Sequence, residues 1–229
     1  MKRRIVLVSA IVIVSLFTPW ASVNVYADIF FDDFNDGDAD GWWLGHNQFG
    51  QYGNWRIENG SLLQNRPGDG YVALVEDLLF SSQTIETQLK MNSVAGYGGI
   101  TLWHKDYNNW IRVRVYPAAG NIYVTENIDG SRPDRFLYPY QTSHNTWYNL
   151  RVDVDSPSGE LGVYIDDNYL FTYTAITPYR TGSSGVFSGN SGGYFDDFSI
   201  VPVPSAVLLA TLGLTFSGGL LRRRRGGHY

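Results

Sequence analysis

Apolar and polar residues alternate with a period of two along much of this 229-residue chain. Residues 111–116 have the sequence IRVRVY, and residues 150–155 have the sequence LRVDVD. Alternation of this kind gives a strand one buried and one solvated face. Turn signals such as Asp129-Gly130 and Pro157–Gly159 separate about twelve such runs. The pattern predicts an all-β sandwich of two antiparallel sheets, with no helix between the two ends of the chain.

The first 27 residues depart from this pattern. A basic segment, Lys2–Arg4, precedes the nearly unbroken apolar run Ile5–Trp20, and Val25-Tyr26-Ala27 follows as a small-x-small cleavage pattern. These features predict a signal peptide over residues 1–27, with the Sec translocon and signal peptidase as partners. An uncleaved anchor helix is the alternative.

The last 29 residues, 201–229, form a second apolar segment. Ala206–Leu221 contains no charged residue, and Arg222–Arg225 follow directly. Sixteen helical residues rise about 24 Å, against roughly 30 Å of membrane hydrocarbon, so the span is short unless Val201–Ser205 contribute. The arginines favour the cytoplasmic side of the inner membrane. The tail therefore predicts a folded domain outside that membrane.

The Pro-x-Pro motif, the short apolar helix and the arginine cluster together resemble a PEP-CTERM sorting signal. The usual Glu of the Pro-Glu-Pro motif is Val203 here. The resemblance implies exosortase as a partner, transient anchoring in the inner membrane of a Gram-negative bacterium, and later release or attachment at the cell surface or in the extracellular matrix. An ordinary C-terminal membrane helix is the alternative. The sorting residues are Pro202, Pro204, Arg222, Arg223, Arg224 and Arg225.

Removing both ends leaves one domain, residues 28–200. It holds ten of the 17 lysines and arginines against all 22 acids, which gives a net charge of about −12. Such a charge argues against binding to nucleic acid or to anionic lipid. The chain has no cysteine, so disulfides are excluded although export would permit them.

The order of motifs along this domain resembles concanavalin A-like jelly rolls of the laminin-G and glucanase type. The resemblance implies a jelly-roll sandwich and leaves the activity open, because this fold serves hydrolases, lectin-like modules and spacers. It rests on the segments DDFNDGDADGW, NWRIENGSLLQ, GGITLWHKDYNNWIRVRV, NTWYNLRVDVD, LGVYIDDNYLFTY and GYFDDFSI.

Catalysis has little support in the sequence. Retaining glucanases of this fold carry a Glu-x-Asp-x-Glu strand that places nucleophile and acid at a short separation. No two glutamates here are two or four residues apart. The segment GGITLWHKDYNNWIRVRV resembles the 3-keto-glycoside hydrolase group, which leaves a hydrolytic or lyase role as an alternative.

The same segment is the best candidate for sugar binding, because it combines aromatic rings with planar polar groups. If Ile111 and Val113 face the core, Arg112 and Arg114 share the solvated face. Pairing of these arginines with Asp153 and Glu126 across strands is the structural alternative. We expect Trp103 to be exposed and Trp110 to be buried. The candidate ligand-binding residues are Trp103, His104, Asp106, Trp110, Arg112, Arg114 and Tyr116.

An internal echo predicts how the domain closes. FFDDF at residues 30–34 returns as YFDDF at residues 194–198, so the first and last strands are expected to be neighbours. Their aspartates, with an Asp-x-Asp-x-Asp-Gly loop at residues 36–41, suggest a calcium site where the chain ends meet. A solvated acidic turn is the alternative. The candidate calcium ligands are Asp32, Asp33, Asp36, Asp38, Asp40, Asp196 and Asp197.

Taken together, the sequence predicts an exported, non-catalytic glycan-binding protein with extracellular polysaccharide as its partner. A glycoside hydrolase and a spacer without a ligand are the alternatives.

Overall fold

The computed structural model describes residues 30–132, 135–190 and 192–202. This part of the chain forms fifteen strands and one short 3-10 helix, Pro117–Ala119. The strands are β1 Phe30–Asp32, β2 Trp42–Leu44, β3 Trp55–Glu58, β4 Ser61–Gln64, β5 Tyr71–Val75, β6 Gln83–Met91, β7 Tyr97–Asp106, β8 Asn109–Tyr116, β9 Asn121–Asn127, β10 Arg135–Pro139, β11 Tyr148–Asp155, β12 Glu160–Ile165, β13 Asn168–Thr174, β14 Ser183–Gly189 and β15 Gly193–Pro202.

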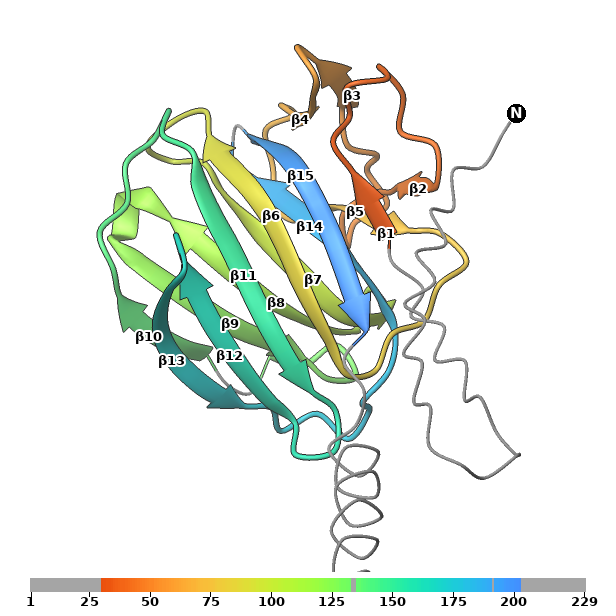
Figure 1. Ribbon diagram of the computed structural model, residues 1–229, viewed down its shortest axis with the longest axis vertical. Coiled ribbons are helices and arrows are strands. Elements are labelled where there is room, and N and C mark those ends of the chain that lie inside the picture. The colour runs from red at the N-terminus through yellow and green to blue at the C-terminus, as the bar shows by residue number, and fades with distance from the viewer. Residues whose placement is uncertain (1–29, 133–134, 191, 203–229) are drawn as a thin grey trace, which may run out of the picture.

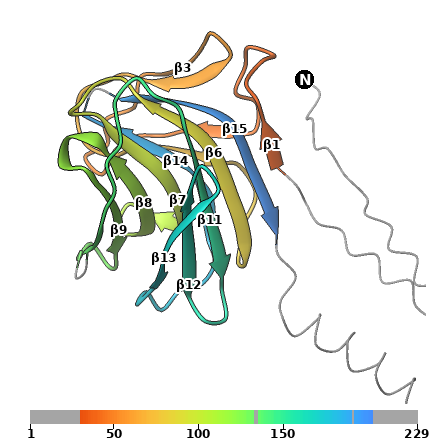
Figure 2. The ribbon, with the colours of Figure 1, turned by 60° about the vertical axis from the view of Figure 1, so that its left-hand side comes forward.

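The strands form two antiparallel sheets that pack face to face (Figure 1). One sheet has the order β13-β12-β11-β6-β15-β4-β3, with β1 also paired to β15, and is called the eight-stranded sheet. The other has the order β10-β9-β8-β7-β14-β5-β2 and is called the seven-stranded sheet. Both sheets are curved and twisted in the second view (Figure 2). The expected antiparallel sandwich is confirmed.

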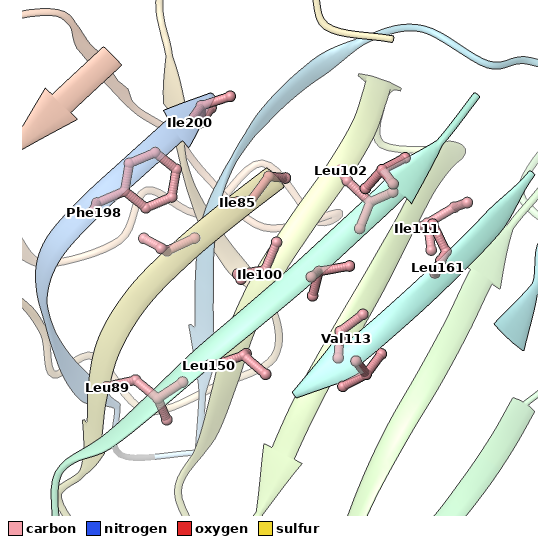
Figure 3. Packing of buried hydrophobic residues seen from close by; sticks show 14 of the residues in the cluster. Ile85, Leu89, Ile100, Leu102, Ile111, Val113, Leu150, Leu161, Phe198 and Ile200 are labelled. Carbon is pink, nitrogen blue, oxygen red and sulfur yellow. The ribbon is translucent and has the colours of Figure 1, made fainter. Parts of the chain in front are cut away.

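Period-two alternation builds the core between the sheets. Along β6, buried and half-buried residues alternate without a break from Gln83 to Met91. Ile85 and Leu89 face Ile100 and Val113 of the opposite sheet (Figure 3), and all four are fully buried. Burial of these side chains is the main favourable term in folding such a sandwich.

Tight turns join neighbouring strands where the sequence predicted them. The turn between β3 and β4 holds Asn59 and Gly60 at φ values of 54° and 73°. Asp166 and Asp167, between β12 and β13, have φ values of 49° and 61°. Two successive residues with positive φ suit the right-handed twist of a hairpin, and Asn, Asp and Gly adopt this conformation at the lowest cost.

The first and last strands are neighbours, as the internal echo predicted. In the antiparallel β1–β15 pair, Phe30 lies opposite Ile200 and Asp32 lies opposite Phe198. The Phe198 ring packs edge-on against Trp42, with ring centroids 4.8 Å apart. Not every aromatic of the echo is buried, because Phe31 is 53% exposed.

The predicted end segments lie outside the described residues. Pro202, the first proline of the predicted sorting motif, ends β15 opposite Gln83, so the strand continues two residues beyond the expected domain end at Ile200. The described residues do not include the predicted signal peptide, Pro204 or Arg222–Arg225. Within the described ranges, no helix has both the length and the apolar character needed to cross a membrane.

Candidate ligand-binding face

Strand β8 presents two arginines on the outer face of the seven-stranded sheet. Ile111, Val113 and Val115 are fully buried in the core, so Arg112 and Arg114 between them point to the other side. In the sheet register, Arg112 lies between Thr101 of β7 and Thr125 of β9. The site therefore lies on inner strands of the sheet, each of which pairs with a neighbouring strand on both sides.

A second apolar cluster covers this outer face. It consists of Val72, Leu74, Tyr97 and Phe187, and Tyr107 and Tyr116 pack against it. These residues come from β5, β7, β8, β14 and the β7–β8 turn, and β8 also supplies the arginines. We call this surface the arginine face; it comprises Val72, Leu74, Tyr97, Trp110, Arg112, Arg114, Tyr116 and Phe187.

The Arg112 guanidinium is stacked between two rings. Its central carbon lies 4.1 Å from the Trp110 ring centroid and 4.7 Å from that of Phe187. The side chain is buried, with Arg112 only 8% exposed. Burial lowers the pKa of Arg112 to about 10, while Asp69 and Tyr97 act in the opposite direction. The guanidinium is therefore charged at neutral pH.

Few hydrogen bonds satisfy this buried cation. One terminal nitrogen donates to the Gly70 carbonyl oxygen over 3.4 Å, a long contact. Among the described residues, the Nε of Arg112 is buried and has no acceptor. Gly70 also leaves the room that the guanidinium needs, because a Cβ on it would lie 2.6 Å from an Arg112 terminal nitrogen.

Arg114 extends over tyrosine rings. Its guanidinium carbon lies 4.5 Å from the Tyr123 centroid, 4.9 Å from Tyr97 and 5.6 Å from Tyr116. Tyr97 in turn donates a hydrogen bond from its hydroxyl to the Asp69 carboxylate. Burial and this carboxylate raise the pKa of the Tyr97 hydroxyl above its ordinary value.

Loop 45–53 adds aromatic rings beside the arginine face. The His46 ring stacks on Tyr107 at 4.2 Å and contacts Trp43 and Tyr52 edge-on. Trp43 is 36% exposed, Tyr52 is 63% exposed and Phe49 is 72% exposed. The predicted site did not include these rings, although the cluster of aromatic residues at 42–55 could have indicated them.

Trp103 is not the exposed tryptophan that we expected. It is fully buried in the main core, and its indole nitrogen donates to the Ser81 carbonyl oxygen. The cause is a bulge in β7, where Trp103 has φ +47° and the pairing with β8 and β14 shifts register. A bulge inverts the alternation that follows it. Trp110, expected in the core, is buried in the arginine face instead.

The other predicted ligand-binding residues lie in three places. Tyr116 belongs to the arginine face, and buried His104 lies beside it with its ring edge-on to Tyr107. Asp106 is exposed in the β7–β8 turn, where its carboxylate accepts hydrogen bonds from the Asn108 backbone and the Asn109 side chain. Asp106 therefore shapes the turn.

The alternative in which the arginines pair across strands with Glu126 and Asp153 is wrong. Glu126 is buried and accepts hydrogen bonds from the Tyr173 hydroxyl and from the backbone nitrogens of Ile176 and Thr177. Asp153 belongs to β11 of the eight-stranded sheet and accepts from the Thr84 hydroxyl. Both acids serve contacts away from the arginine face.

The predicted calcium ligands do not gather into one group. Among residues 30–132, 135–190 and 192–202, no three acidic or histidine side chains are placed to hold a metal ion together. Asp33, Asp36 and Asp38 accept hydrogen bonds from backbone nitrogens two residues on, which are turn contacts. Burial raises the pKa of Asp32 to about 6, and its two oxygens accept from Phe34 and Trp42. Asp40, Asp196 and Asp197 complete the predicted set, and the calcium site stays a prediction.

Comparisons with known proteins show the fold. No family model matches the sequence, and no curated protein matches it. The chain is similar in structure to the carbohydrate-binding module CBM66 from Bacillus subtilis, with a TM-score of 0.61 and 16% identity over 70% of this chain and 95% of that one. It is also similar to a β-glucanase from Bacillus licheniformis, with a TM-score of 0.58 and 12% identity over 77% and 98%.

A third similar structure is a protein of unknown function with a galectin-like fold from Bacillus subtilis. Its TM-score is 0.59, with 10% identity over 77% of this chain and 96% of that chain. At these identities, the likeness establishes a concanavalin A-like jelly-roll sandwich. Fold alone does not assign a function, so the function has to be argued from the arginine face.

Proposed function

We propose that this jelly-roll domain is a non-catalytic glycan-binding module, and that glycan binds on the arginine face and the adjoining rings of loop 45–53. The observation that carries the proposal is Arg112 stacked between Trp110 and Phe187, next to exposed aromatic rings. A sugar offers C–H groups to an aromatic ring and hydroxyls to planar donors. Trp110 and Phe187 are buried, so the exposed rings of Trp43, Phe49 and Tyr52 supply the aromatic surface, and the arginines supply the planar donors.

The absence of a glucanase motif from the sequence supports binding without hydrolysis. Such hydrolysis needs two carboxylates flanking one bond. Near the arginine face, the Asp69 carboxylate accepts a hydrogen bond from Tyr97, and that of Asp106 accepts hydrogen bonds within its own turn. Neither carboxylate is arranged as one of an acid and nucleophile pair.

The two end segments of the sequence support a proposal about the location of the protein. We propose export by the signal peptide, transient anchoring in the inner membrane by residues 201–229, and processing by exosortase before display at the cell surface or in the extracellular matrix. Mass spectrometry of the surface fraction in a host with exosortase should find a chain lacking Arg222–Arg225. An intact C-terminus at Tyr229 would contradict the processing.

Binding is tested with the full chain in mild detergent and a panel of immobilised neutral and acidic polysaccharides. We expect retention on at least one polysaccharide, and Tyr52→Ala should weaken it by about tenfold with an unchanged melting temperature, since one exposed stacking ring is lost. Tyr169→Ala is the matched control, because Tyr169 is 58% exposed on β13 of the other sheet. No retention on any polysaccharide would refute the proposed function.

A further inference from the structure

We infer that the glycan is acidic and that its carboxylate or sulfate group binds to the arginine face at Arg112 and Arg114. The inference rests on the proposed function and names the chemical class of its ligand. It is carried by the state of Arg112, by the grouping of charges around it, and by the geometry of guanidinium groups.

Arg112 is a buried cation with unused donors. A guanidinium has five N–H groups, and the described contacts of Arg112 are one long hydrogen bond to the Gly70 carbonyl and the two rings that enclose it. Burying a charge is costly unless hydrogen bonds or an opposite charge compensate for it. An anion on this face would supply the missing compensation.

Further cations surround Arg112. Arg114 is its neighbour on the same face, and the Arg132 guanidinium carbon also lies over the Trp110 ring, 5.2 Å from the ring centroid. Both of these arginines lower the pKa of Arg112. Three of the ten bases of the predicted domain therefore converge here, although that domain carries a net charge of about −12.

Among the described residues, Asp69 is the acid whose charge acts on Arg112, and one carboxylate does not balance the charge of three arginines. Its carboxylate accepts a hydrogen bond from the Tyr97 hydroxyl. Together with Tyr97, it raises the pKa of Arg112, whereas Arg114 and Arg132 lower it. Among the described charged residues that act on Arg112, bases outnumber acids, the reverse of the domain as a whole.

The arrangement suits an oxyanion better than a neutral hydroxyl. Arg112 and Arg114 lie two residues apart on β8, which is about 7 Å along a strand. Aromatic rings lie within about 6 Å of both guanidinium carbons and restrict where these groups can move, and each guanidinium carries its N–H groups in a planar fork. Carboxylates and sulfates have oxygens that accept two parallel hydrogen bonds from such a fork.

The test uses two matched pairs of probes with the full chain. The first pair is oligogalacturonate and the same oligomer with its carboxyls methyl-esterified. The second is a sulfated galactan oligomer and its desulfated form. We expect wild type to bind at least one acidic member tenfold or more tightly than its neutral partner, and to lose this preference as NaCl rises. The pair that shows the preference identifies carboxylate or sulfate as the group bound.

Variants assign the effect to the face. Arg112→Lys keeps a charge and loses the fork, and Arg114→Gln loses the charge; each should reduce the preference for the acidic member at least fivefold. Arg151→Gln is the control, since Arg151 stacks on Tyr164 at 3.9 Å on the eight-stranded sheet. Equal or weaker binding of both acidic members in wild type overturns the inference.

The two proposals fail in distinguishable ways. If wild type binds only neutral members of the polysaccharide panel, the acidic ligand is wrong and glycan binding stands. If no polysaccharide is retained, both are wrong. If Arg112→Lys lowers the melting temperature by more than about 10 °C, Arg132→Gln decides instead, because exposed Arg132 is bonded only to Gln48 among the described hydrogen bonds. An unchanged preference in Arg132→Gln would then count against the inference.

Discussion

Burial holds the His104 imidazole in its neutral form. The residue is 5% exposed, and its Nε2 has no partner among the described residues. Burial first, and the charge of Arg112 second, lower the pKa of His104 to about 3. In the unfolded chain, the imidazole takes up its proton near pH 6.5. The folded state therefore loses stability as the pH falls from 6.5 towards 3.

The substitution His104→Phe should remove this loss of stability at low pH. The free energy of unfolding of wild type, relative to the variant, should fall by up to about 5 kcal/mol between pH 7 and pH 3. Urea unfolding at several pH values measures the difference. The raised pKa of Asp32 stabilises the fold as the pH falls through 6, which opposes the effect of His104. The test is therefore the difference between wild type and His104→Phe at each pH, and not the pH dependence of wild type alone. His144→Gln is the control, because His144 is exposed. A difference in unfolding free energy between wild type and His104→Phe that does not change with pH would contradict the prediction.

At the scale of elements, one bulge decides what the sequence could show about the site. Strict alternation from Ile100 and Leu102 places Trp103 outside, and the sequence contains no glycine or proline at Trp103 to mark the bulge. Positive φ at a tryptophan is rare, so no local preference predicts it. Alternation did place Arg112 and Arg114 on the side of β8 opposite the core, because β8 has no irregularity opposite β9. It did not predict that Arg112 is buried there rather than solvated.

The alternation of apolar and polar residues predicts long strands better than short ones. Long strands with one buried face, such as β6, β8 and β11, were predictable. Strands of three or four residues, such as β1 and β2, are too short to show a period. The aromatic cluster at 42–55 could have indicated candidate rings, but not that they lie beside Arg112, because contacts such as that between His46 and Tyr107 depend on how distant segments pack.

Gly182 makes the bulge in β7 sterically feasible. A Cβ on Gly182 would lie 2.4 Å from the backbone carbonyl carbon of Trp103. We expect Gly182→Ala to lower the free energy of unfolding by about 1–3 kcal/mol, since backbone atoms have to move. Gly162→Ala on β12 is the matched control, because its nearest neighbour would be a ring atom at 3.4 Å. Equal stability of the two variants in urea would show that the bulge accommodates a methyl group.

At the scale of the whole molecule, the aromatic cluster beneath β1 joins the start of the described domain to its end. Phe198 is fully buried between Trp42 and Phe30. Phe198→Ala should lower the free energy of unfolding by about 3–5 kcal/mol, the usual cost of removing a core phenylalanine. Phe31→Ala, at a neighbouring residue that is 53% exposed, should change it by less than about 0.5 kcal/mol. A small effect of Phe198→Ala would show that β1 lies outside the cooperative unit.

The pairing of β1 with β15 also determines how the domain responds to mechanical force. Phe30 lies opposite Ile200, so tension between these two points acts on one end of a three-pair ladder and opens the pairs in turn. Tension between Pro202 and a ligand held at Arg112 would also load the pairs of β15 with β6, which reach from Gly193 to Pro202 with a break between Asp196 and Ser199. Under the proposed C-terminal tether and glycan site, drag on a bound glycan would act on this longer ladder rather than on the three β1–β15 pairs alone.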